Sequence, residues 1–182
     1  MDETQARIDP SSIVPPGSSF TVRAIDPETD KPWVRRLLKQ YWASTRIVGK
    51  GQVHEADQLP GFGAFRDNEP VGLITYIFHE IGNGAKDCEI VTHNSLAGSG
   101  GIGSCLLAAV RHEARAAGCR RLWLITTNDN TPALRFYQRR DFDLVALYRD
   151  AIAAARALKP EIPDLGLFGI PLKHELELEY IL

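Results

Sequence analysis

Apolar residues in the first half of the chain fall into short runs separated by turn-forming residues. Residues 20–25 predict a first strand, and Asp30 and Pro32 predict the start of a helix, because the apolar residues that follow recur at helical spacing. Three further runs are expected to be strands: residues 61–65, 71–79 and 87–96. Short turns connect these runs, so successive strands should pair antiparallel. Residues 45–60 have a mixed pattern that predicts neither a helix nor a strand.

The pattern changes after the last of these strands. A glycine-rich loop leads into an apolar stripe of helical spacing at residues 102–117, and Gly118 is placed to end that helix. The bulky apolar run 120–126 then predicts a strand parallel to the one before the loop, because a helix that joins two strands makes a right-handed crossover. Thr131 as cap and Pro132 after it should begin another helix.

The C-terminal part adds two expected strands and one short helix. Residues 142–148 predict a strand, and a helix should follow and stop before Lys159. The last segment alternates strictly between two sets: Leu172, Leu176 and Leu178 on one side, and Lys173, Glu175, Glu177 and Glu179 on the other. A charged face of this kind is typical of a solvated outer strand. The expected fold class is α+β, or mixed α/β, with a mostly antiparallel sheet and one parallel strand–helix–strand unit.

Composition narrows the class of protein. The 182 residues predict one domain, and a formal net charge of −2 leaves no basic excess for binding nucleic acid. No apolar run reaches the roughly 18 residues of a membrane span, so no membrane partner is expected. Residues 1–19 lack the apolar core of a signal peptide and are expected to be a flexible tail before a domain at 20–182.

The cysteines are three in number and widely spaced. An odd count without a C-x-x-C pair predicts free, buried thiols in a reducing cytoplasm, and these are Cys88, Cys105 and Cys119. The four His-Glu dipeptides contain no H-E-x-x-H pattern, so no metal site is expected.

Four glycines cluster around the start of the helix at 102–117, and these are Gly98, Gly100, Gly101 and Gly103. Free amides at a helix N-terminus favour an anion, so the loop predicts a phosphate or pyrophosphate site. From Gly98 the spacing also fits the dinucleotide fingerprint G-x-G-x-x-G. That interpretation lacks the acidic residue expected for the ribose, because Asp129 comes too late. A third interpretation is that the glycines only form a turn.

Two blocks of the sequence resemble the GNAT superfamily of N-acetyltransferases. The segment GSGGIG resembles the family's acyl-CoA pyrophosphate motif, Q/R-x-x-G-x-G/A, with Gly101 and Gly103 as its glycines and Gly98 in the place of Gln or Arg. Residues 130–142 resemble a second block, N-x-x-A-x-x-F-Y-x-x-x-G-F. Asp141 replaces its glycine, and Asp tolerates the left-handed backbone that the turn requires. The resemblance implies a GNAT-like central mixed sheet with helices on both faces.

This resemblance also implies the chemistry and the residues that perform it. Acetyl-CoA would donate an acyl group to an amine of a small molecule or peptide, and Tyr137 would protonate the leaving thiolate. Asn130 would contact the cofactor or only cap its helix, and Tyr137 and Phe136 have core packing as their alternative role. The implied cofactor contacts are Val91, Thr92 and His93 for pantetheine; Gly98, Ser99, Gly100, Gly101, Ile102, Gly103 and Ser104 for pyrophosphate; and Asn130 and Phe136.

The general base is expected on the strand before the glycine loop. Strand alternation places Glu89, Val91 and His93 on one face, and the family often carries a carboxylate there, so Glu89 is the first candidate. His93 is the second, since its unperturbed pKa near ~6.5 suits a base. A base acting through water, or no base, is the remaining alternative.

Acceptor contacts and a rival function complete the interpretation. Tyr41 and His54 lie where the family's acceptor pocket forms and are expected to contact the acceptor. The rival is a non-catalytic module that binds or senses acyl-CoA. The sequence leaves open the identity of the acceptor and the choice between monomer and dimer.

Overall fold

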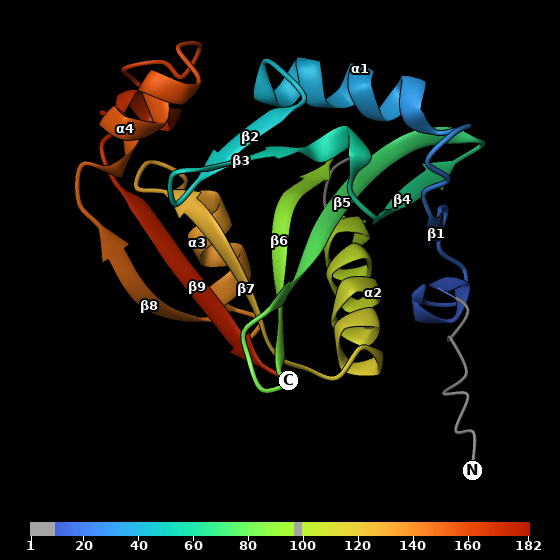
Figure 1. Cartoon of the computed structure of the whole chain (residues 1–182). Coiled ribbons are helices and arrows are strands. Elements are labelled where there is room, and N and C mark those ends of the chain that lie inside the picture. The colour runs from blue at the N-terminus through green and yellow to red at the C-terminus, as the bar shows by residue number, and fades with distance from the viewer. Residues whose placement is uncertain (1–9, 97–99) are drawn as a thin grey trace.

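The computed structural model describes residues 10–96 and 100–182, which form a seven-stranded sheet covered by helices on both faces (Figure 1). The strand order is β1-β4-β5-β6-β7-β9-β8. Only β6 and β7 pair parallel, and all other neighbours pair antiparallel. The strands are β1 (Thr21–Ala24), β4 (Gly61–Arg66), β5 (Glu69–Glu80), β6 (Lys86–Ser95), β7 (Cys119–Thr127), β8 (Asp143–Tyr148) and β9 (Glu175–Ile181). The mixed sheet with one parallel unit is thus confirmed.

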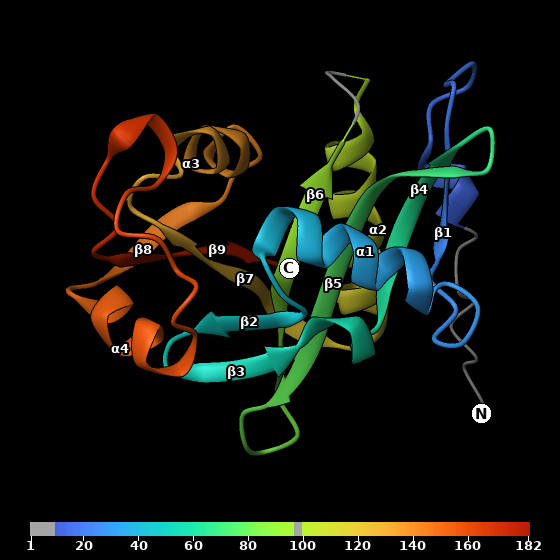
Figure 2. The same cartoon turned by 90° about the horizontal axis from the view of Figure 1, so that it is seen from above.

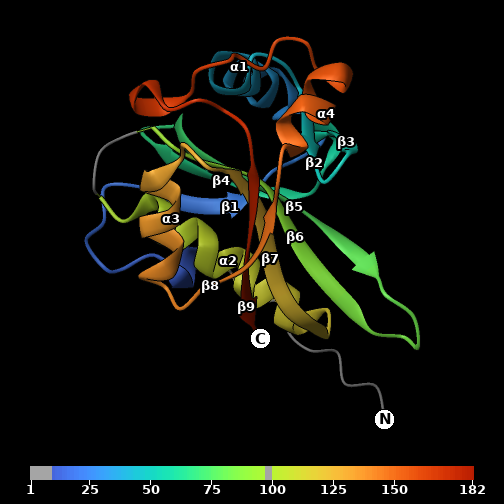
Figure 3. The same ribbon diagram turned by 90° about the vertical axis from the view of Figure 1, so that its left-hand side faces the viewer.

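Helices divide between the two faces of the sheet because side chains alternate along the central strands. Ile74 of β5 packs into a core with α2 (Ile102–Ala116) and α3 (Thr131–Gln138), whereas its neighbour Leu73 packs against α1 (Lys31–Trp42). A fourth helix, α4 (Ala151–Leu158), lies on the α1 side near β2, as Figure 3 shows. The helices α1, α2 and α3 begin within a residue or two of their expected positions, and α4 ends before Lys159 as expected.

The segment that the sequence pattern did not assign is a hairpin. It consists of β2 (Arg46–Gly49) and β3 (Gln52–Glu55), followed by the short 3-10 turn η2 (Ala56–Gln58). Lys50 and Gly51 connect the strands with φ angles of 49° and 72°, the left-handed backbone that a two-residue hairpin turn needs. Figure 2 shows the hairpin reaching beneath α1 toward α4.

The C-terminal strand is not the solvated outer strand that its alternation predicted. β9 lies between β7 and β8, and its acidic face is buried, with Glu175 and Glu177 only 2% and 4% exposed. Glu177 receives hydrogen bonds from Lys50 Nζ at 2.9 Å, from Arg121 Nη1 at 3.0 Å and from the Tyr148 hydroxyl. Cations on other elements therefore pair with the acidic stripe in the interior, where an unpaired carboxylate would be costly.

Residues 10–19 belong to the segment expected to be a tail. Pro10–Ile13 form a 3-10 turn, η1, and Ile13 and Val14 pack against the α2 core. The three cysteines are free and buried, as expected. Within the described ranges, no helix has the length and apolar character to cross a membrane.

Candidate active site

The parallel strands β6 and β7 separate toward their carboxyl ends. Their pairing runs from Lys86–Cys119 to Ile90–Leu124. Beyond Ile90, β6 continues to Ser95 with no further pair to β7 in the described part of the chain, and Figure 1 shows the two strands diverging. The backbone groups on that edge of β6 therefore have no partner strand and are available to a ligand.

A bulge in β6 lies at the start of this separation. Thr75 of β5 pairs with Thr92, but the next residue, Tyr76, pairs with Ile90, so Val91 is an extra residue in β6. As a result Val91 and Thr92 both face the α1 side: Val91 joins the α1 core, and the Thr92 hydroxyl lies 2.7 Å from that of Thr75. One extra residue inverts the alternation that follows it.

This bulge overturns the expectation that Glu89, Val91 and His93 share one face. Glu89 and Val91 point to the α1 side, where Glu89 meets His54 and His79. His93 points to the opposite side, against α2 and α3. The two candidate bases are therefore on different faces of the sheet.

A cavity of about 630 Å³ opens where the strands separate. Glu89, Ile90 and Val91 of β6 form one wall, and Ile125 and the residues after it in β7 form another. The remaining walls come from the end of α1, the β2–β3 hairpin, α4 and the segment after α4; their residues include Tyr41, Trp42, Ile47, His54, Ile152, Lys159, Ile162, Leu165 and Leu172. Tyr41 and His54, both expected to contact an acceptor, thus line the same cavity as Glu89.

Glu89 is a buried carboxylate with one close partner. It is 5% exposed, and His79 Nε2 donates a hydrogen bond of 2.6 Å to its Oε2. His54 Nε2 lies 3.8 Å from the other oxygen, Oε1. Because Oε2 bonds to His79, Oε1 is the oxygen that lies on the side of His54, which lines the cavity. Among the described residues no group of three or more His, Cys, Asp or Glu is arranged to hold a metal.

His79 was not singled out as a site residue from the sequence. It lies across the β5–β6 hairpin, where Ile77 pairs with Glu89 and His79 with Asp87. Its ring therefore reaches Glu89 diagonally, as neighbours two residues apart on adjacent strands do. The register of this hairpin, counted back from the tight turn at residues 81–85, would have predicted the contact between His79 and Glu89.

Tyr137, which is buried, and His93, which is partly buried, form a pair beneath the first turn of α2. His93 Nε2 lies 3.1 Å from the carbonyl oxygen of Gly103, and Nδ1 lies 2.8 Å from the Tyr137 hydroxyl. A carbonyl only accepts, so Nε2 carries the proton. Burial lowers the pKa of His93 to about 4, so at neutral pH the ring has a single proton and Nδ1 accepts from Tyr137.

The hydrogen bond between His93 and Tyr137 affects the roles expected of both residues, His93 as a base and Tyr137 as a proton donor. Both ring nitrogens of His93 are engaged on the face away from Glu89. Burial raises the pKa of the Tyr137 phenol, so it keeps its proton at neutral pH. The cavity lining, taken over the described residues, includes Asn130 at the start of α3 but not Tyr137.

The first turn of α2 offers backbone amides that the helix does not use. Its first internal hydrogen bond runs from the Cys105 amide to the Gly101 carbonyl, so the amides of Ile102, Gly103 and Ser104 precede it. Gly101 caps the helix with φ +81°, and a Cβ on Gly103 would meet the Phe136 ring at 3.3 Å. Gly98 and Ser99 lie outside the described residues; Gly100, which is described, is exposed.

The second block of the sequence places a basic surface beside this turn. The Asn130 side chain accepts a hydrogen bond of 3.2 Å from the Ala133 amide, so it caps α3, and Asp141 has the left-handed φ of +64° expected of it. Arg140 stacks 3.7 Å above the Phe136 ring and donates 2.6 Å to the Ser104 hydroxyl.

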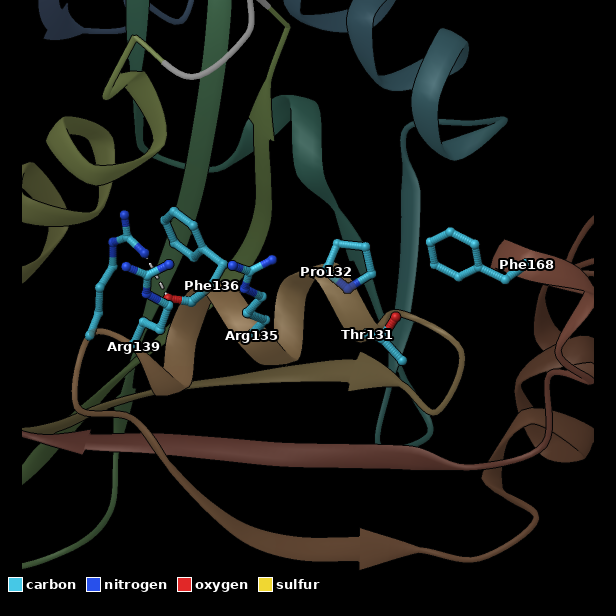
Figure 4. Close-up of a pocket in the computed structure, with 7 residues that line it drawn as sticks. Thr131, Pro132, Arg135, Phe136, Arg139 and Phe168 are labelled. Atoms are coloured by element: carbon cyan, nitrogen blue, oxygen red, sulfur yellow. Dashed lines mark hydrogen bonds between the residues drawn. The ribbon is translucent and has the colours of Figure 1, made fainter.

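Figure 4 shows this surface, a hollow along α3 into which Phe168 also faces. Its lining residues are Thr131, Pro132, Arg135, Phe136, Arg139, Arg140 and Phe168. The three arginines were not among the predicted site residues, although the run RFYQRR places Arg135 and Arg139 one helical turn apart. Arginines and aromatic rings together suit a phosphorylated, ring-containing ligand.

The parted parallel strands and the open helix N-terminus are arranged as the resemblance to GNAT proteins implies for an acyltransferase that binds coenzyme A. Residues 22–142 match the model of the acetyltransferase (GNAT) family. The chain belongs to this family and is an acyltransferase of the GNAT type.

Two relatives match most of the chain, and solved acetyltransferase structures share its fold. Two Bacillus subtilis (strain 168) proteins, the uncharacterized proteins YxbD and YdhI, are 39% and 36% identical over 150 residues, which is 82% of this chain and 91% of each relative. The IAA acetyltransferase of Bacillus cereus ATCC 14579 has a similar fold, with a TM-score of 0.66 and 18% identity over 90% of this chain and 100% of that one. Arabidopsis thaliana Naa50, in complex with the bisubstrate analogue CoA-Ac-MVNAL, has a TM-score of 0.64 and 17% identity over 90% and 99%.

Proposed function

We propose that the protein transfers an acetyl group from acetyl-CoA to an amine held in the cavity between β6 and β7. One observation carries this proposal: the buried carboxylate of Glu89 lines the cavity that opens where the two strands part. The amine must lose a proton as it reacts, and a carboxylate in a cavity of largely apolar walls is suited to accept it.

Acetyl-CoA fits the groups on the donor side. The free edge of β6 from Val91 to His93 would pair with the amides of pantetheine, and the amides from Gly100 to Ser104 would hold the pyrophosphate. Gly101 carries no side chain that would keep a phosphate away from these amides, and a Cβ there would point into open space. Among solved GNAT structures, one from Elizabethkingia anophelis has acetyl-CoA bound, which supports the same donor for this chain.

Each step then has a candidate group on this chain. Acetyl-CoA supplies a thioester whose carbonyl carbon the neutral amine attacks, and coenzyme A leaves as a thiolate. Glu89 takes the proton that the nitrogen loses, and its hydrogen bond from His79 keeps its free oxygen toward the amine. Tyr137, still protonated at neutral pH, would donate a proton to the thiolate after turning its hydroxyl away from His93.

The proposal is tested by thiol release with acetyl-CoA and a panel of amines, combined with calorimetric titration of CoA. Transfer predicts both turnover and binding. Binding without turnover for any amine would identify a module that senses acyl-CoA instead. A melting temperature raised by NADPH but not by acetyl-CoA would restore the dinucleotide interpretation of the glycine loop.

A further inference from the structure

Lys159 is a buried cation in the wall of the acceptor cavity. It follows α4, is 6% exposed, and lines the cavity together with Glu89. Its ammonium donates to two backbone carbonyls, that of Trp42 at 2.6 Å and that of Arg46 at 2.8 Å. An ammonium has three N–H donors, so one of them has no hydrogen-bond partner among the residues that the structure describes.

The other buried charged groups of this cavity have partners. Glu89 accepts from His79, Asp129 accepts from the Thr127 hydroxyl and the Leu167 amide, and Glu175 accepts from the Lys50 amide. None of the ion pairs found among the described residues involves Lys159. Within that part of the chain it is thus a buried cation without an anion.

An unpaired buried cation is costly, and the two carbonyls do not require one. A neutral amide side chain has two N–H donors and would satisfy both. Burial lowers the pKa of the Lys159 ammonium, while the exposed Glu161 acts to raise it and Arg46 to lower it further. An anion placed against the ammonium from the cavity side would compensate for the lost hydration.

We propose that Lys159 binds a carboxylate of the acceptor, so that the acceptor is an amine that also carries a carboxylate on an aliphatic body. This inference rests on the proposed function and names the class of its substrate. Glu89 and Lys159 belong to different walls of the cavity. Glu89 would contact the amine of the acceptor, and Lys159 would bind its carboxylate. The cavity lining includes aliphatic side chains that suit a hydrocarbon body, and these are Ile47, Ile125, Ile152, Ile162 and Leu172.

The test compares acceptors in matched sets. Straight-chain and branched aliphatic amino acids are assayed beside the alkylamine and the neutral amino amide of the same carbon skeleton. Each set is run on wild type, Lys159→Gln, Lys159→Arg and the control Lys173→Gln, an exposed lysine that does not line the cavity. Comparing variants for the same acceptor cancels the intrinsic reactivity of each amine.

In the wild type, the amino acids should have the highest kcat/KM of their sets. Lys159→Gln should lower kcat/KM for the amino acids by about 10- to 100-fold relative to the alkylamines, the effect of one charge-assisted hydrogen bond. Lys159→Arg should retain part of the preference and Lys173→Gln all of it. A preference that is absent in wild type, shared by the amino amides or unchanged in Lys159→Gln overturns the assignment.

A binding measurement keeps the two proposals apart. Unreactive alkyl carboxylates, titrated into the CoA-saturated protein, should bind about 10-fold or more tightly than the neutral alkyl amides of equal length. This comparison needs only wild-type protein, so it stands even where a Lys159 variant does not fold. Equal affinities overturn the role of Lys159. Discrimination without turnover of any amine leaves the anion site intact and rejects the transfer reaction.

Discussion

At the scale of single residues, the two groups proposed for proton transfer lie on opposite faces of β6. Glu89 lies with His54 and His79 on the α1 side, and His93 lies with Tyr137 on the side of α2 and α3. The reacting nitrogen would therefore meet a carboxylate, and the leaving sulfur a phenol. His79 holds Glu89, and His93 holds Tyr137, by a hydrogen bond. Conservative substitutions of Glu89 and Tyr137 therefore test their proposed roles.

Glu89→Gln keeps the size of the side chain and removes the base. We expect kcat to fall by about 10²–10⁴-fold, most strongly at lower pH where the amine is largely protonated, because no group then accepts its proton. Affinity for CoA should change little. Steady-state thiol release across a pH series, with the exposed Glu69→Gln as control, measures this effect. A profile that superimposes on wild type would remove Glu89 as the base.

Tyr137→Phe keeps the ring and deletes the hydroxyl. We expect a loss in kcat toward the lower end of the ~10²–10⁴-fold range, because an alkyl thiolate with a conjugate pKa of about 8.5 is already a fair leaving group. The variant also leaves His93 Nδ1 without its donor, which should cost about 1–3 kcal/mol of stability. Thermal melting and thiol release separate the two effects. An unchanged kcat in a destabilised protein would make Tyr137 a packing residue.

At the scale of secondary-structure elements, the N-terminus of α2 and the acidic face of β9 are in opposite situations: one lacks a charged partner among the described residues, and the other has two. The N-terminus of α2 presents amides without an acidic side chain in its first turn. The acidic face of β9 is buried between Lys50 of the β2–β3 turn and Arg121 of β7. The first arrangement suits a bound anion, and the second stabilises the sheet.

Substitutions at Gly101 distinguish backbone strain from charge at the α2 N-terminus. Both Gly101→Ala and Gly101→Glu must adopt φ +81°, which costs about 1–2 kcal/mol of stability. Only Gly101→Glu adds a negative charge where a pyrophosphate is expected, so its affinity for CoA should fall about tenfold or more below that of Gly101→Ala. Calorimetric titration of both folded variants checks this, and equal affinities would argue against a pyrophosphate at these amides.

The acidic face of β9 predicts how stability depends on pH. Burial opposes ionisation of Glu177, but hydrogen bonds from Tyr148 and Lys50 outweigh it and hold the pKa of Glu177 below its usual value. A lowered pKa gives stability that is present above the unfolded value near ~4.3 and is lost as the pH falls through the folded value. Glu177→Gln should therefore melt lower at neutral pH and lose part of the acid dependence.

Glu175→Gln provides the matched comparison on the same face. Burial raises the pKa of Glu175, so its charge disfavours folding at neutral pH, and that penalty disappears as the pH falls. The amide oxygen of Gln can still accept from the Lys50 amide, so the melting temperature at neutral pH should stay the same or rise. Melting curves over a pH series test both variants; a drop for Glu175→Gln equal to that for Glu177→Gln would contradict this account.

At the scale of the whole molecule, local pattern predicted more of the fold than of the site. The strands of the seven-stranded sheet, the helices and the parallel unit follow from periodicity and turn residues within short windows, whereas the β2–β3 hairpin had no such pattern. The bulge at Val91 does not, because one extra residue leaves the apolar run of β6 unchanged while it turns His93 to the other face. The burial of Glu177 and the position of Lys159 depend on partners more than 100 residues away in the sequence.

The parting of β6 and β7 also has a consequence for hydrogen exchange. Amides on the free edge of β6 after Ile90 have no ladder partner in β7, so their deuterium uptake follows local opening and not global unfolding. We expect them to exchange quickly in the free protein and to slow once acetyl-CoA pairs with that edge, while amides near Leu122, paired with both neighbouring strands, change little. A footprint limited to Val91–Ser95 and the first turn of α2 would mark the donor site without any acceptor in hand.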